Sequence, residues 1–170
     1  AALAAEFGPM LLDMNEAEAL ALVKDRTVDA MMAMIRDDLK ALGVEMDVYS
    51  SEKALYGTGR IEAAIERLRS MDLIYRGVLE PPKGKTPEDW EPVELPLFRS
   101  TRFGDDQDRP IRKSDGSWTY FGADLAYHMQ KAEGADALID IWGADHAGTV
   151  KRIVAAVAAL TEGKTRFDVK

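Results

Sequence analysis

Two stretches of this chain indicate its fold: residues 113–128, with the sequence KSDGSWTYFGADLAYH, and residues 138–148, with the sequence LIDIWGADHAG. The first reads as a turn followed by a helix, and the second as an apolar strand followed by a glycine turn. A helix to about Leu160 and a strand beginning at Phe167 are predicted to follow. This alternation of strands and helices is typical of parallel-sheet nucleotide-binding folds.

The first stretch carries a candidate binding pair. Tyr120 and Asp124 are four residues apart where a helix begins, so their side chains share one face of that helix. A carboxylate can hold a guanidinium through two parallel charge-assisted hydrogen bonds, and a phenol adds a polar contact or a ring face. An ordinary core phenol next to a helix-capping carboxylate fits the same spacing, and the spacing alone does not choose between them.

The second stretch places Gly143, Asp145 and His146 after an apolar strand, at the end where open α/β sheets bind ligands. The glycine would let a nucleotide approach the backbone, and Asp145 would accept hydrogen bonds from ribose hydroxyls. Asp145 could equally cap the helix that follows. His146 lies at the start of that helix, where the dipole favours a neutral, hydrogen-bonded ring. One turn beyond Asp124, His128 is interpreted as a structural histidine.

Composition excludes several classes of protein. The 170 residues are 46% hydrophobic, which is enough for a packed core. The net charge of -8 argues against a chain whose main task is to coat nucleic acid. Cysteine is absent and the two histidines are 18 positions apart, so we expect no protein-bound metal. No apolar run is long enough to predict a membrane span.

The first 50 residues are predicted to be mostly helical. Apolar residues recur at helical spacing from Asn15, a potential cap, to Leu42, and Gly43 would end this helix. Its length suggests a break near residues 24–26. The three methionines Met31, Met32 and Met34 are interpreted as core filler. The alternating segment 44–49 is predicted to form a short strand.

Residues 51–110 look like a small insertion of helices and a hairpin. A helix is expected over 60–71, and two strands over 73–78 and 95–100, with Pro96 confining its strand to a sheet edge. Residues 80–90, rich in Pro, Gly and charge, should form an exposed mobile loop. The aspartates of segment 105–108 are interpreted as a solvated acidic turn, since the spacing of a calcium loop is missing.

These predictions combine into an α/β fold: a partial Rossmann-type parallel sheet with a helical N-terminal portion and a small α+β insertion. The expected division has three parts. Residues 1–50 form a helical segment and short strand of a catalytic domain, residues 51–110 the insertion, and residues 111–170 part of the second half of the Rossmann domain.

Several motifs in one order resemble the arginyl-tRNA synthetases, class I aminoacyl-tRNA synthetases of the bacterial type. They are Asp108-Arg109-Pro110, then KSDG at 113–116, TYFGADLAYH at 119–128, WGADHAG at 142–148 and VKR at 150–152. Upstream, the segment DVYSSE at 47–52 resembles the lead into the insertion of that family. The similarity extends from about Val28 to the end of the chain.

The resemblance implies a role for each matching residue. Tyr120 and Asp124 match the pair that holds the arginine side chain, and His146 falls in a turn near the bound amino acid. Gly143 and Asp145 match the element set against the adenosine ribose of ATP. The implied protein is a cytoplasmic ligase, expected to be a monomer with no membrane association. It uses ATP with Mg²⁺ as the counter-ion and joins L-arginine to tRNA through an arginyl-adenylate.

The sequence also departs from the family. It contains neither the His-x-Gly-His type signature nor the Lys-Met-Ser-Lys type loop, so both ATP signature motifs are missing. We therefore expect an internal fragment that has no catalytic residue of its own and is inactive alone. One alternative is a non-catalytic RNA- or partner-binding module, with Lys83, Lys85 and Arg99 as possible RNA contacts. The other is an unrelated nucleotide-binding domain.

Overall fold

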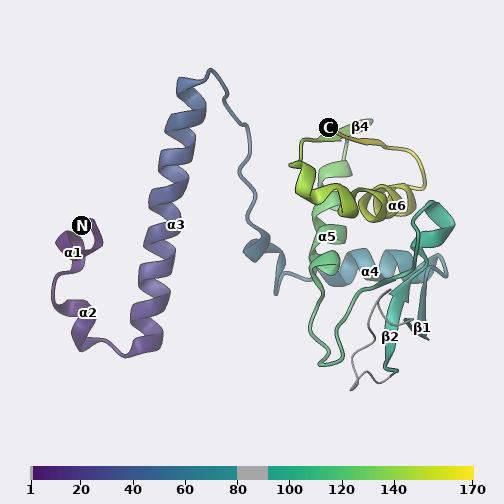
Figure 1. The fold of residues 1–170 in the computed structure, drawn as a ribbon, viewed down its shortest axis with the longest axis horizontal. Helices are drawn as coiled ribbons and strands as arrows, with labels where there is room; N and C mark the ends of the chain where they lie inside the picture. The colour runs from purple at the N-terminus through teal and green to yellow at the C-terminus, as the bar shows by residue number, and fades with distance from the viewer. Residues whose placement is uncertain (1, 80–91) are drawn as a thin grey trace. The chain divides into compact units, whose positions relative to one another are not determined.

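The computed structural model describes residues 2–79 and 92–170 (Figure 1). The chain divides into two compact units, residues 1–49 and residues 50–170. The predicted loop at 80–90, with Lys83 and Lys85, lies outside the described residues.

The first unit consists of three helices, α1 (Ala2–Phe7), α2 (Met10–Asp13) and α3 (Glu16–Ala41). The predicted long helix is confirmed as α3. The Asn15 side chain caps it by accepting a hydrogen bond from the backbone N–H of Glu18 at 2.9 Å. After the helix, Gly43 adopts a φ of +77°, which glycine tolerates without steric cost. The suggested break near residues 24–26 is wrong, since the sequence there contains no glycine or proline and the helix continues through it.

Two other predictions for this unit are wrong. Residues 44–49 have no strand structure, because a strand needs a neighbour for its backbone N–H and C=O groups and none pairs with them among the described residues. The methionines are not core filler either. Met31 and Met34 are 47% and 56% exposed, and none of the residues of α3 is buried. Helical periodicity identified an apolar stripe on α3, but periodicity does not show whether another surface packs against that stripe.

The second unit alternates short strands with helices. Its helices are η1 (Glu52–Leu55), α4 (Arg60–Ser70), η2 (Ser100–Phe103), α5 (Tyr120–Ala132), η3 (Ala144–Thr149) and α6 (Val150–Leu160). Its strands are β1 (Ile74–Val78), β2 (Glu94–Phe98), β3 (Arg109–Pro110), β4 (Ala137–Asp140) and β5 (Arg166–Val169).

Strands β1, β2 and β3 form an antiparallel sheet in that order, so β2 is central and the prediction that Pro96 confines it to an edge is wrong. The carbonyl of Pro96 accepts from the Ile111 N–H at 3.0 Å, so the nitrogen of Pro96 faces the β3 side as well. On that side the Ile111 carbonyl is already used by the Thr119 N–H at 3.2 Å. Although Pro96 has no N–H to donate, the Ile111 carbonyl opposite it still has a hydrogen-bond donor.

Strands β4 and β5 pair in parallel, with η3 and α6 between them in sequence. The predicted apolar strand and the strand containing Phe167 are thereby confirmed, and so is the mixed α/β class. Alternation along β4 turns Leu138 and Asp140 inward, whereas Ile139 is 57% exposed. Asp140 is thus a carboxylate on the buried side of an apolar strand.

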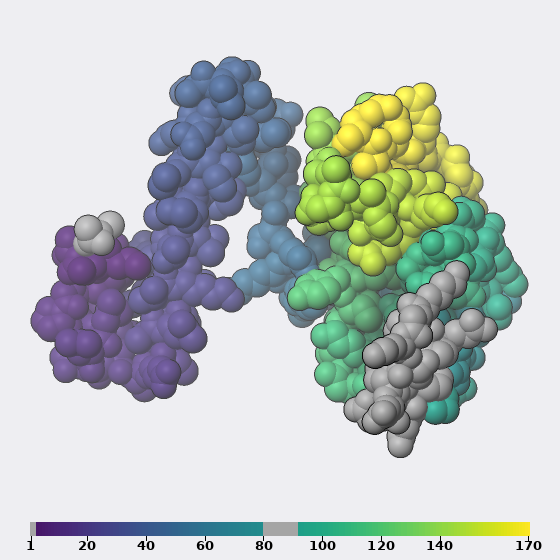
Figure 2. Space-filling model, viewed as in Figure 1, coloured from purple at the N-terminus to yellow at the C-terminus, as the bar shows by residue number. Residues whose placement is uncertain are grey.

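One hydrophobic core unites the second unit. Helices α4, α5 and α6 pack against one another (Figure 1). Leu68, Leu125 and Ile153, one from each helix, are fully buried in a shared hydrophobic cluster. In the space-filling view the teal segment that includes η2 lies against the yellow-green α6 (Figure 2). Residues on both sides of the predicted boundary at 110 therefore share a core, and the three-part division stays a prediction.

The acidic turn is a structural element and was wrongly interpreted as solvated. The Asp105 side chain is fully buried and receives hydrogen bonds from Arg109 Nε at 2.7 Å and Nη2 at 2.6 Å. The Asp108 carboxylate accepts from the Tyr75 hydroxyl at 2.8 Å and from the Thr101 hydroxyl at 2.8 Å. These carboxylates connect the turn to β1, η2 and β3.

Candidate functional site

A cavity of about 480 Å³ lies between α5, α6 and the carboxyl end of β4. The cap of α5 fixes where its first side chains stand: the Thr119 hydroxyl accepts from the Gly122 N–H at 3.3 Å. Polar and aromatic groups dominate the wall, which is formed by Tyr120, Asp124, Tyr127, His128, Asp140, Trp142, His146, Thr149, Arg152 and Ile153. The three residues predicted to bind arginine, Tyr120, Asp124 and His146, all line this cavity.

Asp124 is half-buried, and burial raises the pKa of its carboxyl group above the ordinary value. The neighbouring His128 and Arg152 oppose this rise in pKa, while the negative charge of Glu52 adds to it. Within residues 2–79 and 92–170, no hydrogen bond or ion pair engages the Asp124 side chain. A desolvated carboxylate without a partner is a ready acceptor for a cationic ligand.

The aromatic and imidazole groups form the more open part of the cavity. Tyr120 begins α5 and is 77% exposed, so its phenol can reach a ligand held at Asp124 without losing packing. His146 belongs to η3, and its Nε2 lies 3.5 Å from the Asp145 carboxylate. Its ring centroid lies 6.3 Å from that of Trp142. These groups can contact a ligand through their ring faces and through hydrogen bonds, and they do not enclose it in an apolar pocket.

Gly143 and Asp145 lie in the turn that carries His146 and do not line the cavity. The Asp145 side chain is 82% exposed and makes no cap hydrogen bond to η3, contrary to the capping alternative. It folds so close to Gly143 that a Cβ atom there would lie 2.5 Å from Asp145 Oδ1. The exposed Asp145 side chain could move to make room for such an atom, so this contact does not by itself require glycine, and the carboxylate remains open to solvent and to a ligand.

Two charged residues of the cavity were missed in the sequence. Asp140 accepts from His128 Nε2 at 3.0 Å and also pairs with Lys131. Its place on the inward side of β4, among apolar residues, is a signal that could have identified it. Arg152 has a buried Nε without a hydrogen-bond partner in the part of the chain that the structure describes. Its guanidinium can serve an anionic part of a ligand.

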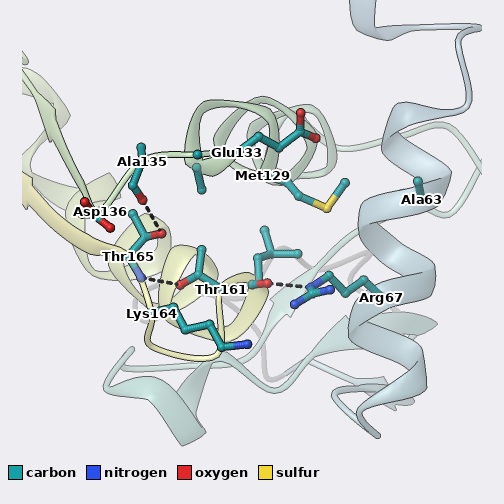
Figure 3. A pocket seen from close by; sticks show the side chains of 12 residues that line it. Ala63, Arg67, Met129, Glu133, Ala135, Asp136, Thr161, Lys164 and Thr165 are labelled. Atoms are coloured by element: carbon teal, nitrogen blue, oxygen red, sulfur yellow. Dashed lines mark hydrogen bonds between the residues drawn. The ribbon is translucent and has the colours of Figure 1, made fainter.

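A larger hollow of about 690 Å³ lies at the other ends of these helices (Figure 3). Its polar groups hold the chain together: Arg67 Nε donates to the Leu160 carbonyl at 2.6 Å, and the Thr165 hydroxyl donates to the Ala135 carbonyl at 2.9 Å. None of the predicted binding residues lines it. We therefore take the cavity at Asp124 as the candidate site.

Neither a metal cluster nor a membrane helix is found in the described ranges. No group of three His, Cys, Asp or Glu side chains there could hold a metal ion. In the same ranges no helix combines the length and the apolarity that crossing a bilayer requires.

Comparison with known proteins identifies relatives along nearly the whole chain. It is 66% identical over 170 residues to an arginine–tRNA ligase from Cereibacter sphaeroides and 68% identical over 173 residues to one from Novosphingobium aromaticivorans. These alignments cover 99% of this chain but only 29% and 30% of the relatives. No family model matches the chain.

A solved structure agrees with these relatives. A crystal structure described as an arginyl-tRNA synthetase from Campylobacter jejuni superposes with a TM-score of 0.77 at 28% identity, covering 98% of this chain and 33% of that one. The resemblance seen in the sequence is confirmed, and an unrelated nucleotide-binding domain is excluded. The chain spans about three tenths of the length of its relatives.

Proposed function

We propose that this chain, which is homologous to the arginine–tRNA ligases along 99% of its length, carries the amino-acid recognition site of an enzyme of that family. The observation that supports this most directly is Asp124, a half-buried carboxylate without a partner in the described residues, in the same cavity as Tyr120 and His146. The whole enzyme would join L-arginine to its tRNA in the cytoplasm, with ATP and Mg²⁺, as a monomer not associated with a membrane.

The chemistry of Asp124 fits arginine better than other amino acids. A guanidinium is planar, always charged and able to donate two parallel hydrogen bonds to one carboxylate. Lysine brings the charge but not the planar fork, and a neutral side chain would leave the desolvated carboxylate unpaired. Tyr120 would add a ring face or a polar contact, and His146 a hydrogen bond near the amino acid.

We assign the adenosine ribose of ATP to the turn of Gly143 and Asp145. The exposed Asp145 carboxylate can accept hydrogen bonds from the ribose hydroxyls, and the glycine lets the sugar approach the backbone. In such enzymes the arginine carboxylate attacks the α-phosphate of ATP, and a tRNA hydroxyl then takes the aminoacyl group. The protein mainly orients the reactants and stabilises charge.

We expect the 170-residue chain alone to form no arginyl-adenylate. Neither ATP signature motif occurs in the sequence, so groups that stabilise the transferring phosphoryl group are missing. Arginine-dependent exchange of pyrophosphate into ATP measures this step directly, and the chain should show none above a blank without protein. Exchange above that blank would contradict the assignment of a recognition role only.

Binding of the free amino acid tests the proposal. In a titration of the chain followed by ¹H–¹⁵N NMR, L-arginine should shift the amide signals around Asp124 and Tyr120. L-citrulline, which has the same shape but a neutral urea group, should bind at least about tenfold more weakly, since a charge-assisted hydrogen bond is worth more than 1.4 kcal/mol. L-lysine should also bind more weakly. Equal affinities for arginine and citrulline would refute a carboxylate-centred site.

The alternative of an RNA- or partner-binding module has less support. Of its three suggested contacts, only Arg99 lies in the described residues. The guanidinium of Arg99 stacks over the Tyr75 ring at 4.3 Å, and its Nε is buried. A group held against the protein in this way is poorly placed to meet a phosphate backbone. In the whole enzyme, tRNA remains the expected partner.

A further inference from the structure

A buried carboxylate joins two cations next to the proposed arginine site. Asp140, the last residue of β4, is 8% exposed. Its Oδ2 lies 3.0 Å from His128 Nε2, and its Oδ1 forms an ion pair with Lys131. Burial alone would raise the pKa of Asp140, but the hydrogen bonds from Lys131 and His128 lower it below the ordinary value. Asp140 is therefore ionised at neutral pH.

The second nitrogen of His128 also faces an acceptor. His128 Nδ1 lies 2.8 Å from the backbone carbonyl oxygen of Asp124, one helical turn earlier in α5. A carbonyl oxygen can only accept, so Nδ1 must carry a hydrogen for this bond to form. The ionised Asp140 likewise only accepts, so Nε2 must carry one too. A neutral imidazole has a single N–H, and the two bonds together require an imidazolium.

We propose that Asp140 is a positioning residue for the arginine site: it keeps the buried His128 doubly protonated, and so places a fixed positive charge one helical turn from Asp124. This inference rests on the function proposed above. The ring of His128 is 4% exposed and packs edge-on against Tyr127 and Phe167, so solvent screens this charge weakly.

The positive charge matters because Asp124 must be ionised to hold a guanidinium. Burial favours the protonated form of Asp124, and His128 opposes this effect more strongly than any other neighbouring group. The charged or titratable groups around the pair come from several elements: Glu52 from η1, Tyr56 after it, Tyr120 and Lys131 from α5, and Arg152 from α6. Among them, Glu52 works against ionisation of Asp124, and Arg152 supports it.

The protonation of His128 can be measured on the unmodified chain. The sequence contains only two histidines, so the ring ¹⁵N spectrum holds two sets of signals. At pH 7.5, where a solvent-exposed imidazole is mostly neutral, both ring nitrogens of His128 should show the shifts of protonated nitrogen. The exposed His146, followed through pH, provides the reference shifts of both ring forms. A non-protonated nitrogen in His128 at pH 7.5 would overturn the proposal.

Substitution then tests the link to arginine. Asp140→Asn keeps the shape but removes the negative charge, and Lys131 remains to repel a proton on His128. This variant should lose the imidazolium signals and bind L-arginine about tenfold more weakly at pH 7. As the pH is lowered, the affinity of this variant for L-arginine should begin to fall at a higher pH than that of the wild type, because Asp124 would take up a proton more readily. The control, Asp168→Asn on the neighbouring strand β5, should leave both the signals and the affinity unchanged.

The outcomes separate this inference from the proposed function. A variant Asp140→Asn that keeps the imidazolium, or that loses it while arginine affinity and its pH profile stay the same, would overturn the positioning role. A wild-type chain that fails to bind arginine although His128 carries both protons would instead overturn the proposed function, and the charge arrangement would be confirmed by itself.

Discussion

The variant Asp124→Asn is expected to lose nearly all affinity for L-arginine. The carboxamide is neutral, and its NH₂ group would face the donors of the guanidinium instead of accepting from them. Removing one partner of a desolvated charge pair costs about 2–5 kcal/mol, so the dissociation constant should rise at least about thirtyfold. In the whole enzyme the same variant should raise the arginine requirement far more than the ATP requirement. Isothermal titration of the chain and steady-state kinetics of the enzyme measure the two effects.

The folding of this variant provides an independent check. Because burial raises the pKa of Asp124, the ionised carboxyl group destabilises the folded chain at neutral pH, and this contribution is relieved as the pH falls. Asp124→Asn should therefore unfold at the same temperature as the wild type or higher. A control, Asp136→Asn, changes an exposed carboxylate outside the cavity and should leave arginine affinity unchanged. Equal losses in both variants would contradict a specific role for Asp124.

Local signals in the sequence predicted several elements of the fold. The periodicity and the Asn15 cap of α3 depend on residues within a few positions of one another, and so does the shared helix face predicted for Tyr120 and Asp124. The apolar run of β4 followed by a glycine turn indicated a parallel strand with a ligand-binding end. These features follow from local residue patterns and backbone geometry, which explains why they could be predicted from the sequence.

Features that depend on distant contacts were not predictable in this way. The partner of His128 is twelve residues away on β4, and the buried Nε of Arg152 is evident only once α6 packs against α5. Pro96 is tolerated in a central strand because the Ile111 carbonyl, to which proline cannot donate, accepts a hydrogen bond from the Thr119 N–H instead. In each case the sequence shows the residue type, while its role is set by a neighbour brought close by folding.

The acidic turn, which was misinterpreted for the same reason, gives the largest expected effect on stability. In Asp105→Asn the guanidinium of Arg109, 14% exposed, loses its buried counter-charge. Removing the buried partner of an ion pair costs about 3 kcal/mol of the free energy of unfolding, and the exposed Asp106 carboxylate, which also contacts Arg109, offsets only a small part of this loss. Urea denaturation followed by tryptophan fluorescence measures this loss, because Trp118 and Trp142 lie in the second unit.

The neighbouring carboxylate of Asp106 provides a matched control, and the pH dependence of stability provides a second test. Asp106 contacts the same Arg109 Nη2 atom at 2.6 Å but is 63% exposed, so Asp106→Asn should cost less than about 1 kcal/mol.

Burial opposes ionisation of Asp105, yet hydrogen bonds from Arg109 and the Asp106 N–H lower its pKa below that of an unfolded chain. The pair therefore stabilises the fold above the unfolded pKa, about 3.9, and this contribution is lost as the pH falls through the folded value. The difference in stability between wild type and Asp105→Asn should accordingly be full at pH 7 and shrink below about pH 4. A difference that is independent of pH, or equal costs for the two asparagine variants, would show that burial of the Asp105 charge does not stabilise this turn.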